Sequence, residues 1–162
     1  MKIFLDIDGV MVHGNPHKSV ELENDGFYKF NSIAVEILTS VIYKTKDELI
    51  LSTSHRFRFN LMQWKEIFRS RGIATKSLSI VDSPLQNRWS RKTEILNWII
   101  EHNLDSEDIV IIDDDKSLNE LPSYLKQRLV LTNSFVGLNN VADLSKVLNR
   151  RPKKRLAKKL AY

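Results

Sequence analysis

The chain opens with a short apolar segment that ends in two acids, since residues 2–9 read KIFLDIDG. The residues up to Asp6 predict a strand that is buried on both faces. Asp8 and Gly9 follow directly. Two carboxylates at the end of a buried strand repel each other and lose hydration, which makes them costly without a compensating partner. The opening segment therefore indicates a site for a ligand or ion where the first strand ends.

Apolar segments of similar length recur along the chain and alternate with helical patterns. Beyond residues 7–30, which are expected to be irregular, four more strands are predicted, over residues 48–53, 77–82, 108–115 and 128–132. Helices are predicted between most of them, with Asn31 or Ser32 as the cap of the first and residues 139–148 as the last. Strands that alternate with helices predict an α/β fold, namely a doubly wound, Rossmann-like parallel sheet of about five strands.

The composition excludes several classes of protein and of reactive site. The chain has 162 residues, of which 42% are hydrophobic, and it contains no cysteine. This length favours one domain with a real core. The absence of cysteine excludes disulfides, thiolate metal sites and a cysteine nucleophile. No apolar run is long enough to span a membrane, and Asp6 and Asp8 interrupt the only segment that resembles a signal peptide. A cytoplasmic protein is expected.

The basic residues are concentrated at the carboxyl terminus. Residues 150–162 hold seven Lys and Arg and no acid, whereas the rest of the chain has 18 basic residues against 20 acidic ones. We therefore divide the chain into a body, residues 1–149, and a basic tail, residues 150–162. The tail is interpreted as a solvated end, as a contact for nucleic acid phosphates, or as a contact for an acidic partner or membrane surface. Its few apolar residues argue against membrane insertion.

Polar side chains follow several of the predicted strands. Strand 48–53 ends in Ser52, Thr53 and Ser54, and strand 108–115 ends in Asp113, Asp114 and Asp115, with Lys92 at the start of the helix before it. In parallel α/β sheets, ligands bind beyond the carboxyl ends of the strands, where these residues should converge. An all-oxygen set without His or Cys suits Mg²⁺, and Lys92 with a hydroxyl can hold phosphate oxygens. The set predicts magnesium-dependent phosphoryl transfer.

The order of these motifs is D-x-D-G-V, hydrophobics-S-T, Lys and hydrophobics-D-D, and it resembles the haloacid dehalogenase superfamily of phosphohydrolases over residues 1–149. The segments LDIDGV, LSTSHR, VIIDDD and LTNSFVGL are further similar to small domains of this superfamily in RNA-repair-associated proteins. The resemblance implies a phosphatase, that is, a phosphomonoester hydrolase that works through an aspartyl-phosphate.

The resemblance also implies a role for each matching residue. Asp6 is the expected nucleophile and Asp8 the general acid and base, while Thr53 orients the phosphoryl group and Lys92 neutralises it. The ligands expected for Mg²⁺ are Asp6, Asp8 through its backbone carbonyl, Asp113 and Asp114. The phosphate-binding set is expected to comprise Asp6, Gly9, Thr53, Ser54 and Lys92.

Several of these assignments have alternatives. Ser52 or Ser54 replaces Thr53 if the strand register shifts, and Arg91 is the alternative to Lys92, since both open the same helix. The residues expected to contact the substrate are His55, Arg56 and Arg91. His55 stands where the similar domains often have Trp. Asp115 is expected to have a structural role as a helix N-cap.

The superfamily usually selects substrates with inserted cap domains, but residues 9–30 and 81–91 are too few for a folded cap. An open site suits phosphorylated substrates as large as polynucleotide ends or phosphoproteins, and the basic tail favours nucleic acid. One alternative is a metal-dependent nuclease, which leaves Thr53 and Lys92 without a role. Another is a phospho-receiver, although its motifs come in a different order. The last is a non-catalytic binding module.

Overall fold

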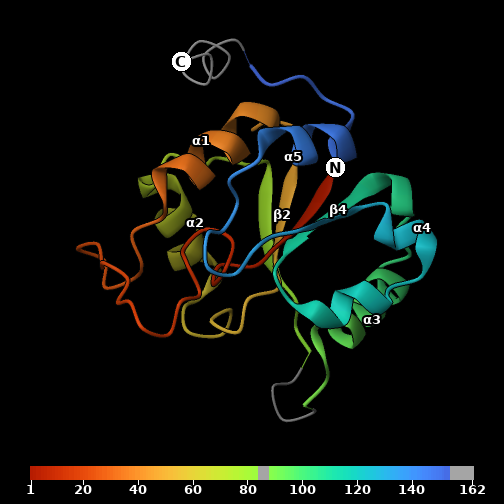
Figure 1. Ribbon diagram of the computed structural model, residues 1–162, viewed down its shortest axis with the longest axis horizontal. Helices are drawn as coiled ribbons and strands as arrows, with labels where there is room; N and C mark the ends of the chain where they lie inside the picture. Colours follow the sequence, from red (N-terminus) through yellow and green to blue (C-terminus); the bar gives the residue numbers. More distant parts are fainter. Residues whose placement is uncertain (84–87, 154–162) are drawn as a thin grey trace.

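The computed structural model describes residues 1–83 and 88–153, and its centre is a parallel sheet with the strand order β3-β2-β1-β4-β5 (Figure 1). The strands are β1 (Lys2–Leu5), β2 (Glu48–Leu51), β3 (Ser77–Ile80), β4 (Ile109–Asp113) and β5 (Leu129–Leu131). In the register, Leu5 lies opposite Leu51 on one side and Ile112 on the other. The predicted α/β class is confirmed, and each observed strand lies within its predicted range.

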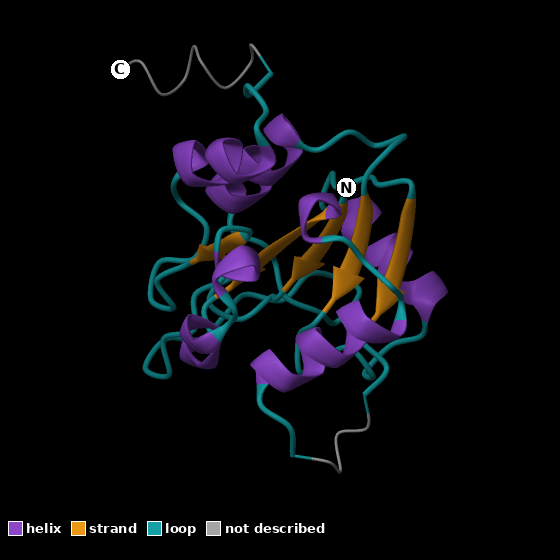
Figure 2. Cartoon of the chain, turned by 90° about the vertical axis from the view of Figure 1, so that its right-hand side faces the viewer, coloured by secondary structure: helices purple, strands orange, loops and turns teal. Residues whose placement is uncertain are grey.

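Helices cover both faces of the sheet (Figures 1 and 2). One layer contains α1 (Ser32–Val41), α2 (Leu61–Ser70) and α5 (Val141–Leu148); the other contains α3 (Arg91–Glu101) and α4 (Ser123–Lys126). The two layers follow from the alternation of side chains along a strand. Ile3 and Leu5 point into the first layer, and Phe4 points into the second. Strands buried on both faces explain the continuous apolar runs of the sequence.

The direction in which the chain winds across the sheet changes between β1 and β4. From β1 the chain winds outward through β2 to β3, then crosses to the other side of β1 to form β4 and β5. Neighbouring β1 and β4 therefore continue into loops that lead away in opposite directions. Such a switch point is where open α/β sheets bind ligands. Asp6 follows β1 here, and its N–H donates to the carbonyl of Ile112 at 3.1 Å.

Capping side chains determine where several helices begin. The Asn31 side chain accepts from Ile33 N–H and caps α1, and the Asp115 side chain caps a short 3₁₀ helix, η3 (Lys116–Glu120), as predicted. Helix α2 begins at a capping box formed by Asn60 and Gln63. The segment between β4 and β5 also folds into η3 and α4, which the sequence did not predict because each is too short to show periodicity.

Residues 9–30 pack against the body and form no separate cap. Their aromatic side chains Phe27 and Phe30 are buried against α2, with the Phe27 ring 5.1 Å from that of Trp64. The second stretch where caps occur, residues 81–91, includes residues 84–87, which lie outside the described part of the chain.

The beginning of the basic tail lies against the body. Arg150 pairs with Asp47, and the Lys153 ammonium donates to the carbonyls of Thr39 and Ile42. The remainder of the predicted tail, residues 154–162, lies outside the described residues. Within residues 1–83 and 88–153, no helix has the length and apolar character needed to cross a membrane.

Candidate active site

Three carboxylates converge where β1 and β4 end. Asp6 follows β1, Asp113 is the last residue of β4, and Asp114 comes next. One oxygen from each carboxylate lies within 4.8 Å of the other two. Asp6 and Asp113 are buried, and Asp114 is partly buried. The structure thus brings together three of the four residues predicted as metal ligands, at the predicted edge of the sheet.

The three carboxylates disfavour one another's ionisation. Burial, followed by repulsion from Asp6, raises the pKa of Asp113 to about 7, and the same two causes raise that of Asp114 to about 6. Burial also raises the pKa of Asp6, although the Arg91 charge and a hydrogen bond from Ile7 N–H oppose the rise. A dry, crowded, all-oxygen set of this kind fits a hard divalent cation such as Mg²⁺.

Arg91, the first residue of α3, supplies positive charge beside this cluster. Its Nη2 lies 3.9 Å from Asp6 Oδ1, and its Nε lies 3.5 Å from Asp113 Oδ2. Its Nη1 is buried and has no hydrogen-bond partner among the described residues. A buried donor without a partner is costly, so it marks a position where an anionic oxygen would be stabilised. Arg91 therefore fits the phosphate-binding position that the sequence left open.

Lys92 points elsewhere. Its ammonium lies 2.6 Å from the Glu120 carboxylate, and its backbone N–H donates to Ser117. Neighbouring residues on a helix project about 100° apart, so Arg91 and Lys92 leave α3 in different directions. In the structure Arg91, the alternative to Lys92, lies beside the acidic cluster, whereas the Lys92 ammonium contacts Glu120.

The hydroxyl groups after β2 divide between the carboxylates. Thr53 is buried and its side chain hydrogen-bonds to Asp6, whereas the Ser52 hydroxyl lies 3.5 Å from Asp113 Oδ2. Ser54 is exposed. The geometry thus leaves Thr53 as the hydroxyl beside the predicted nucleophile Asp6, with the Ser52 hydroxyl beside Asp113 at the end of β4.

Asp8 faces the loop after β2 instead of the three carboxylates. Its Oδ2 lies 2.7 Å from the Nε2 of His55, and its side chain is 42% exposed. Asp8 is therefore the accessible carboxylate, while Asp6 is the buried one. His55, expected to contact the substrate, contacts this predicted acid and base.

Gly9 has a steric role that the sequence pattern did not reveal. Its φ of +74° is in the left-handed region, and a Cβ built on it would lie 2.1 Å from Asp114 Oδ2. Its carbonyl accepts a hydrogen bond from the Thr132 hydroxyl at 2.6 Å. Glycine is thus required because the loop after β1 passes directly over Asp114. We retain phosphate binding by the Gly9 backbone as a prediction.

Arg56 is buried and corrects the expectation of a substrate contact. Its guanidinium donates to the carbonyls of Val81 and Thr53 and to Glu94 Oε1, at 2.7, 3.1 and 2.6 Å. Ser83 also accepts from it and contacts the same Glu94 oxygen. Arg56 therefore ties the loop after β2 to the first turn of α3.

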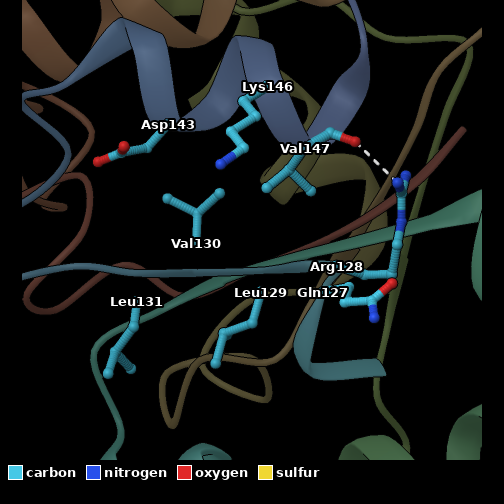
Figure 3. Close-up of a pocket in the computed structure, with 8 residues that line it drawn as sticks. All are labelled: Gln127, Arg128, Leu129, Val130, Leu131, Asp143, Lys146 and Val147. Atoms are coloured by element: carbon cyan, nitrogen blue, oxygen red, sulfur yellow. Dashed lines mark hydrogen bonds between the residues drawn. The ribbon is translucent and has the colours of Figure 1, made fainter. Parts of the chain in front are cut away.

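A groove away from these residues is less suited to chemistry. It has a volume of about 610 Å³ and lies between the edge strand β5 and α5 (Figure 3). Val130, Asp143 and Lys146 face it, and Arg128 donates to the Val147 carbonyl at its side. It contains none of the clustered carboxylates. The candidate active site is therefore the acidic cluster at the switch point.

The fold and the site together define an α/β protein of the haloacid dehalogenase type, with acids after the first and fourth strands, a hydroxyl after the second and a cation before the fourth. The chain belongs to the family described as "HAD domain in Swiss Army Knife RNA repair proteins", which matches residues 2–142. No match to a curated protein was found. The crystal structure of a hypothetical protein from Xanthomonas campestris is similar with a TM-score of 0.43 and 13% identity, covering 99% of this chain and 88% of that one.

Proposed function

We propose that the protein is a magnesium-dependent phosphomonoesterase that works through an aspartyl-phosphate on Asp6. The observation that carries the proposal is the position of Arg91: its Nη2 lies 3.9 Å from Asp6 Oδ1, and its buried Nη1 has no hydrogen-bond partner among the described residues. A nucleophile adjacent to a free buried donor can receive a phosphoryl group whose oxygens that donor stabilises. A haloacid dehalogenase domain supports hydrolysis at the level of the family.

In the proposed first step, a carboxylate oxygen of Asp6 attacks phosphorus and the bond from phosphorus to the leaving oxygen breaks. Asp8 donates a proton to that oxygen as it departs. In the second step, water gives a proton to Asp8 and attacks phosphorus. Inorganic phosphate leaves, and Asp6 is again a free carboxylate. Thr53 and Arg91 orient the phosphoryl oxygens throughout.

The residues that would hold Mg²⁺ are Asp6, Asp113 and Asp114, together with the backbone carbonyl of Asp8. The bound ion would offset the repulsion among these carboxylates and the charge of the phosphoryl group. The raised pKa of Asp113 supports this assignment, because a buried acid with two acidic neighbours needs a compensating charge. The chain supplies the remaining contacts through Thr53 and Arg91.

The proposed substrates are phosphorylated polynucleotide ends. Residues 9–30 form no separate cap, and a site without a cap suits a large substrate. Phe135, which is 60% exposed, lies on a turn whose Ser134 carbonyl accepts from Gly14 N–H. This turn borders the loop after β1, and an exposed ring there can stack on a base.

Release of inorganic phosphate tests the proposal. Wild type, Asp6→Asn and the control Asp105→Asn are compared with Mg²⁺ and with a chelator. The substrates are an aryl phosphate, a sugar phosphate, and oligonucleotides phosphorylated at the 5′ or 3′ end. Asp105 is an exposed residue whose side chain makes no capping hydrogen bond. We expect activity that requires Mg²⁺ and Asp6, survives in Asp105→Asn and is highest on one of the oligonucleotide ends.

Two results would contradict parts of the proposal. Saturating activity on the sugar phosphate, with none on oligonucleotides, would overturn the substrate class alone. Internal cleavage of the oligonucleotide without loss of terminal phosphate would overturn the phosphatase assignment and favour a metal-dependent nuclease.

A further inference from the structure

His55 makes a contact that motif order alone does not explain. Its Nε2 lies 2.7 Å from Oδ2 of Asp8, the shortest polar contact that the described residues give this carboxylate. The Asp8 side chain is 42% exposed. A solvent-exposed carboxylate samples several rotamers, and a single hydrogen bond to a fixed partner restricts it to one.

The imidazole is itself held on several sides. Its ring centroid lies 5.7 Å from that of Phe27 and 5.4 Å from that of Tyr28, with interplanar angles of 77° and 89°. Its backbone N–H donates to the Thr53 hydroxyl oxygen at 3.3 Å. Phe27 is buried in the main core. His55 is therefore a rigid group that links the segment before α1 to the loop that carries Thr53.

We infer that His55 is the positioning residue for Asp8: by holding Oδ2, it turns Oδ1 toward the oxygen that leaves phosphorus. The inference rests on the proposed phosphatase function. It assigns His55 no contact with substrate and no proton of its own to transfer. Its contribution is orientation, and misplacing a proton donor by about 1 Å can cost about 100-fold in rate.

The choice of leaving group distinguishes this role from a general structural one. An alkoxide is a poor leaving group and needs the proton from Asp8, whereas a nitrophenolate leaves without one. Disorder of Asp8 should therefore slow alkyl phosphates and affect nitrophenyl phosphate little. A merely structural loss at the site would lower both rates together, because Asp6, Thr53 and Arg91 serve both substrates.

Two variants test the inference. His55→Phe keeps a flat ring between Phe27 and Tyr28 but removes Nε2, and His55→Gln keeps an amide donor of similar reach. For His55→Phe we expect a fall in kcat of about 30-fold on an alkyl phosphate, less than about threefold on nitrophenyl phosphate, and an unchanged KM. His55→Gln should recover much of the loss.

A double-mutant cycle completes the test, in which His55→Phe and His55→Gln are also made in the Asp8→Asn background. If His55 acts through Asp8, His55→Phe should have no further effect on the alkyl phosphate in that background. Multiplicative losses, or equal losses on both leaving groups, would overturn the inference while leaving the phosphatase intact. Absence of turnover in folded wild type with Mg²⁺ would overturn the proposed function, and the inference with it. If His55→Phe does not fold, His55→Gln carries the same cycle, with partial loss expected only when Asp8 is present.

Discussion

An aspartate is buried at each end of the sheet, but the pKa of one is lowered and the pKa of the other is raised. At the amino end, Asp47 is 0% exposed and accepts hydrogen bonds from Tyr43 N–H at 2.7 Å and from Arg150 Nη2 at 2.9 Å. The amino group of Met1 lies 3.3 Å from its Oδ1. Burial disfavours its charge, but these donors outweigh burial, so the pKa of Asp47 is lowered.

At the carboxyl end, Asp113 is equally buried and its pKa is raised to about 7. Its neighbours include Asp6 and Asp114, and Arg91 only partly compensates for their charge. The comparison shows that partners, more than burial, decide what a buried acid does. Asp47 binds the Met1 amino group and Arg150 at the amino end of the sheet. The cluster around Asp113 has the charge pattern of a site that receives a cation.

The largest expected effect is on phosphate release, and it follows from replacing Arg91 at the carboxyl end of the sheet. We expect Arg91→Met to lower kcat/KM for phosphate release by about 100-fold or more, because it removes the buried donor beside Asp6. The matched variant Lys92→Met changes the neighbouring residue, whose ammonium contacts Glu120, and should lose less than about threefold. Steady-state kinetics on one substrate provides the comparison. A greater loss in Lys92→Met would assign the phosphate position to Lys92.

The amino end should respond through stability. Arg150→Met leaves Asp47 buried with only part of its compensation, and we expect it to lower the free energy of unfolding at neutral pH by about 3 kcal/mol. Arg69→Met is the control, since Arg69 pairs with Glu66 on an exposed helix surface and should change stability by less than about 0.5 kcal/mol. Urea denaturation measures both. Equal small effects would show that Asp47 does not fasten the tail.

Removing the charge of Asp113 at the carboxyl end of the sheet should raise the free energy of unfolding, whereas Arg150→Met should lower it. In metal-free buffer at alkaline pH, we expect Asp113→Asn to stabilise the protein by an amount on the order of 2 kcal/mol, because the ionised Asp113 opposes folding. The same variant should lose its stabilisation by Mg²⁺. Denaturation of both proteins with and without the ion gives the answer. Destabilisation in metal-free buffer would mean that Arg91 already compensates for the cluster.

The pH dependence of stability should separate the two ends. Because the folded pKa of Asp113 is raised, the folded state holds more protons between about pH 4 and pH 7, and metal-free stability should fall as pH rises through that window. The lowered pKa of Asp47 contributes stability above about pH 4, which is lost as pH falls below it.

Magnesium should therefore stabilise the protein more at alkaline pH than near pH 5, where the cluster is partly protonated. At ten times the dissociation constant, the expected gain is about 1.4 kcal/mol. Melting curves recorded across pH with Mg²⁺ and with a chelator measure it. A gain that does not depend on pH would place the ion away from the cluster.

The sequence predicted the parts of the molecule that depend on short-range pattern. The five strands, the Asn31 and Asp115 caps and the acids at the strand ends all follow from runs and spacings within a few residues. The sequence did not decide between Arg91 and Lys92, because the answer depends on the rotation of α3 relative to the sheet. Its first turn is fixed by the Ser90 cap and by the contact of Lys92 N–H with Ser117, two residues into η3.

The burial of Arg56 and Asp47 was hidden for a related reason. Each is a charged residue in a polar segment, which ordinarily indicates a surface. Their partners come from distant parts of the chain: Arg56 bonds to Glu94, and Asp47 pairs with Arg150. Only the assembled fold shows that these charges are compensated.

The most direct test of the account is to identify the residue that is phosphorylated during turnover. Wild-type protein is mixed with an aryl phosphate and Mg²⁺, quenched with acid during turnover, digested and examined by mass spectrometry. The account predicts a phosphoryl group on the peptide containing Asp6, absent in Asp6→Asn, which should also lack turnover. A phosphoryl group on another residue, or full turnover by Asp6→Asn, would contradict it.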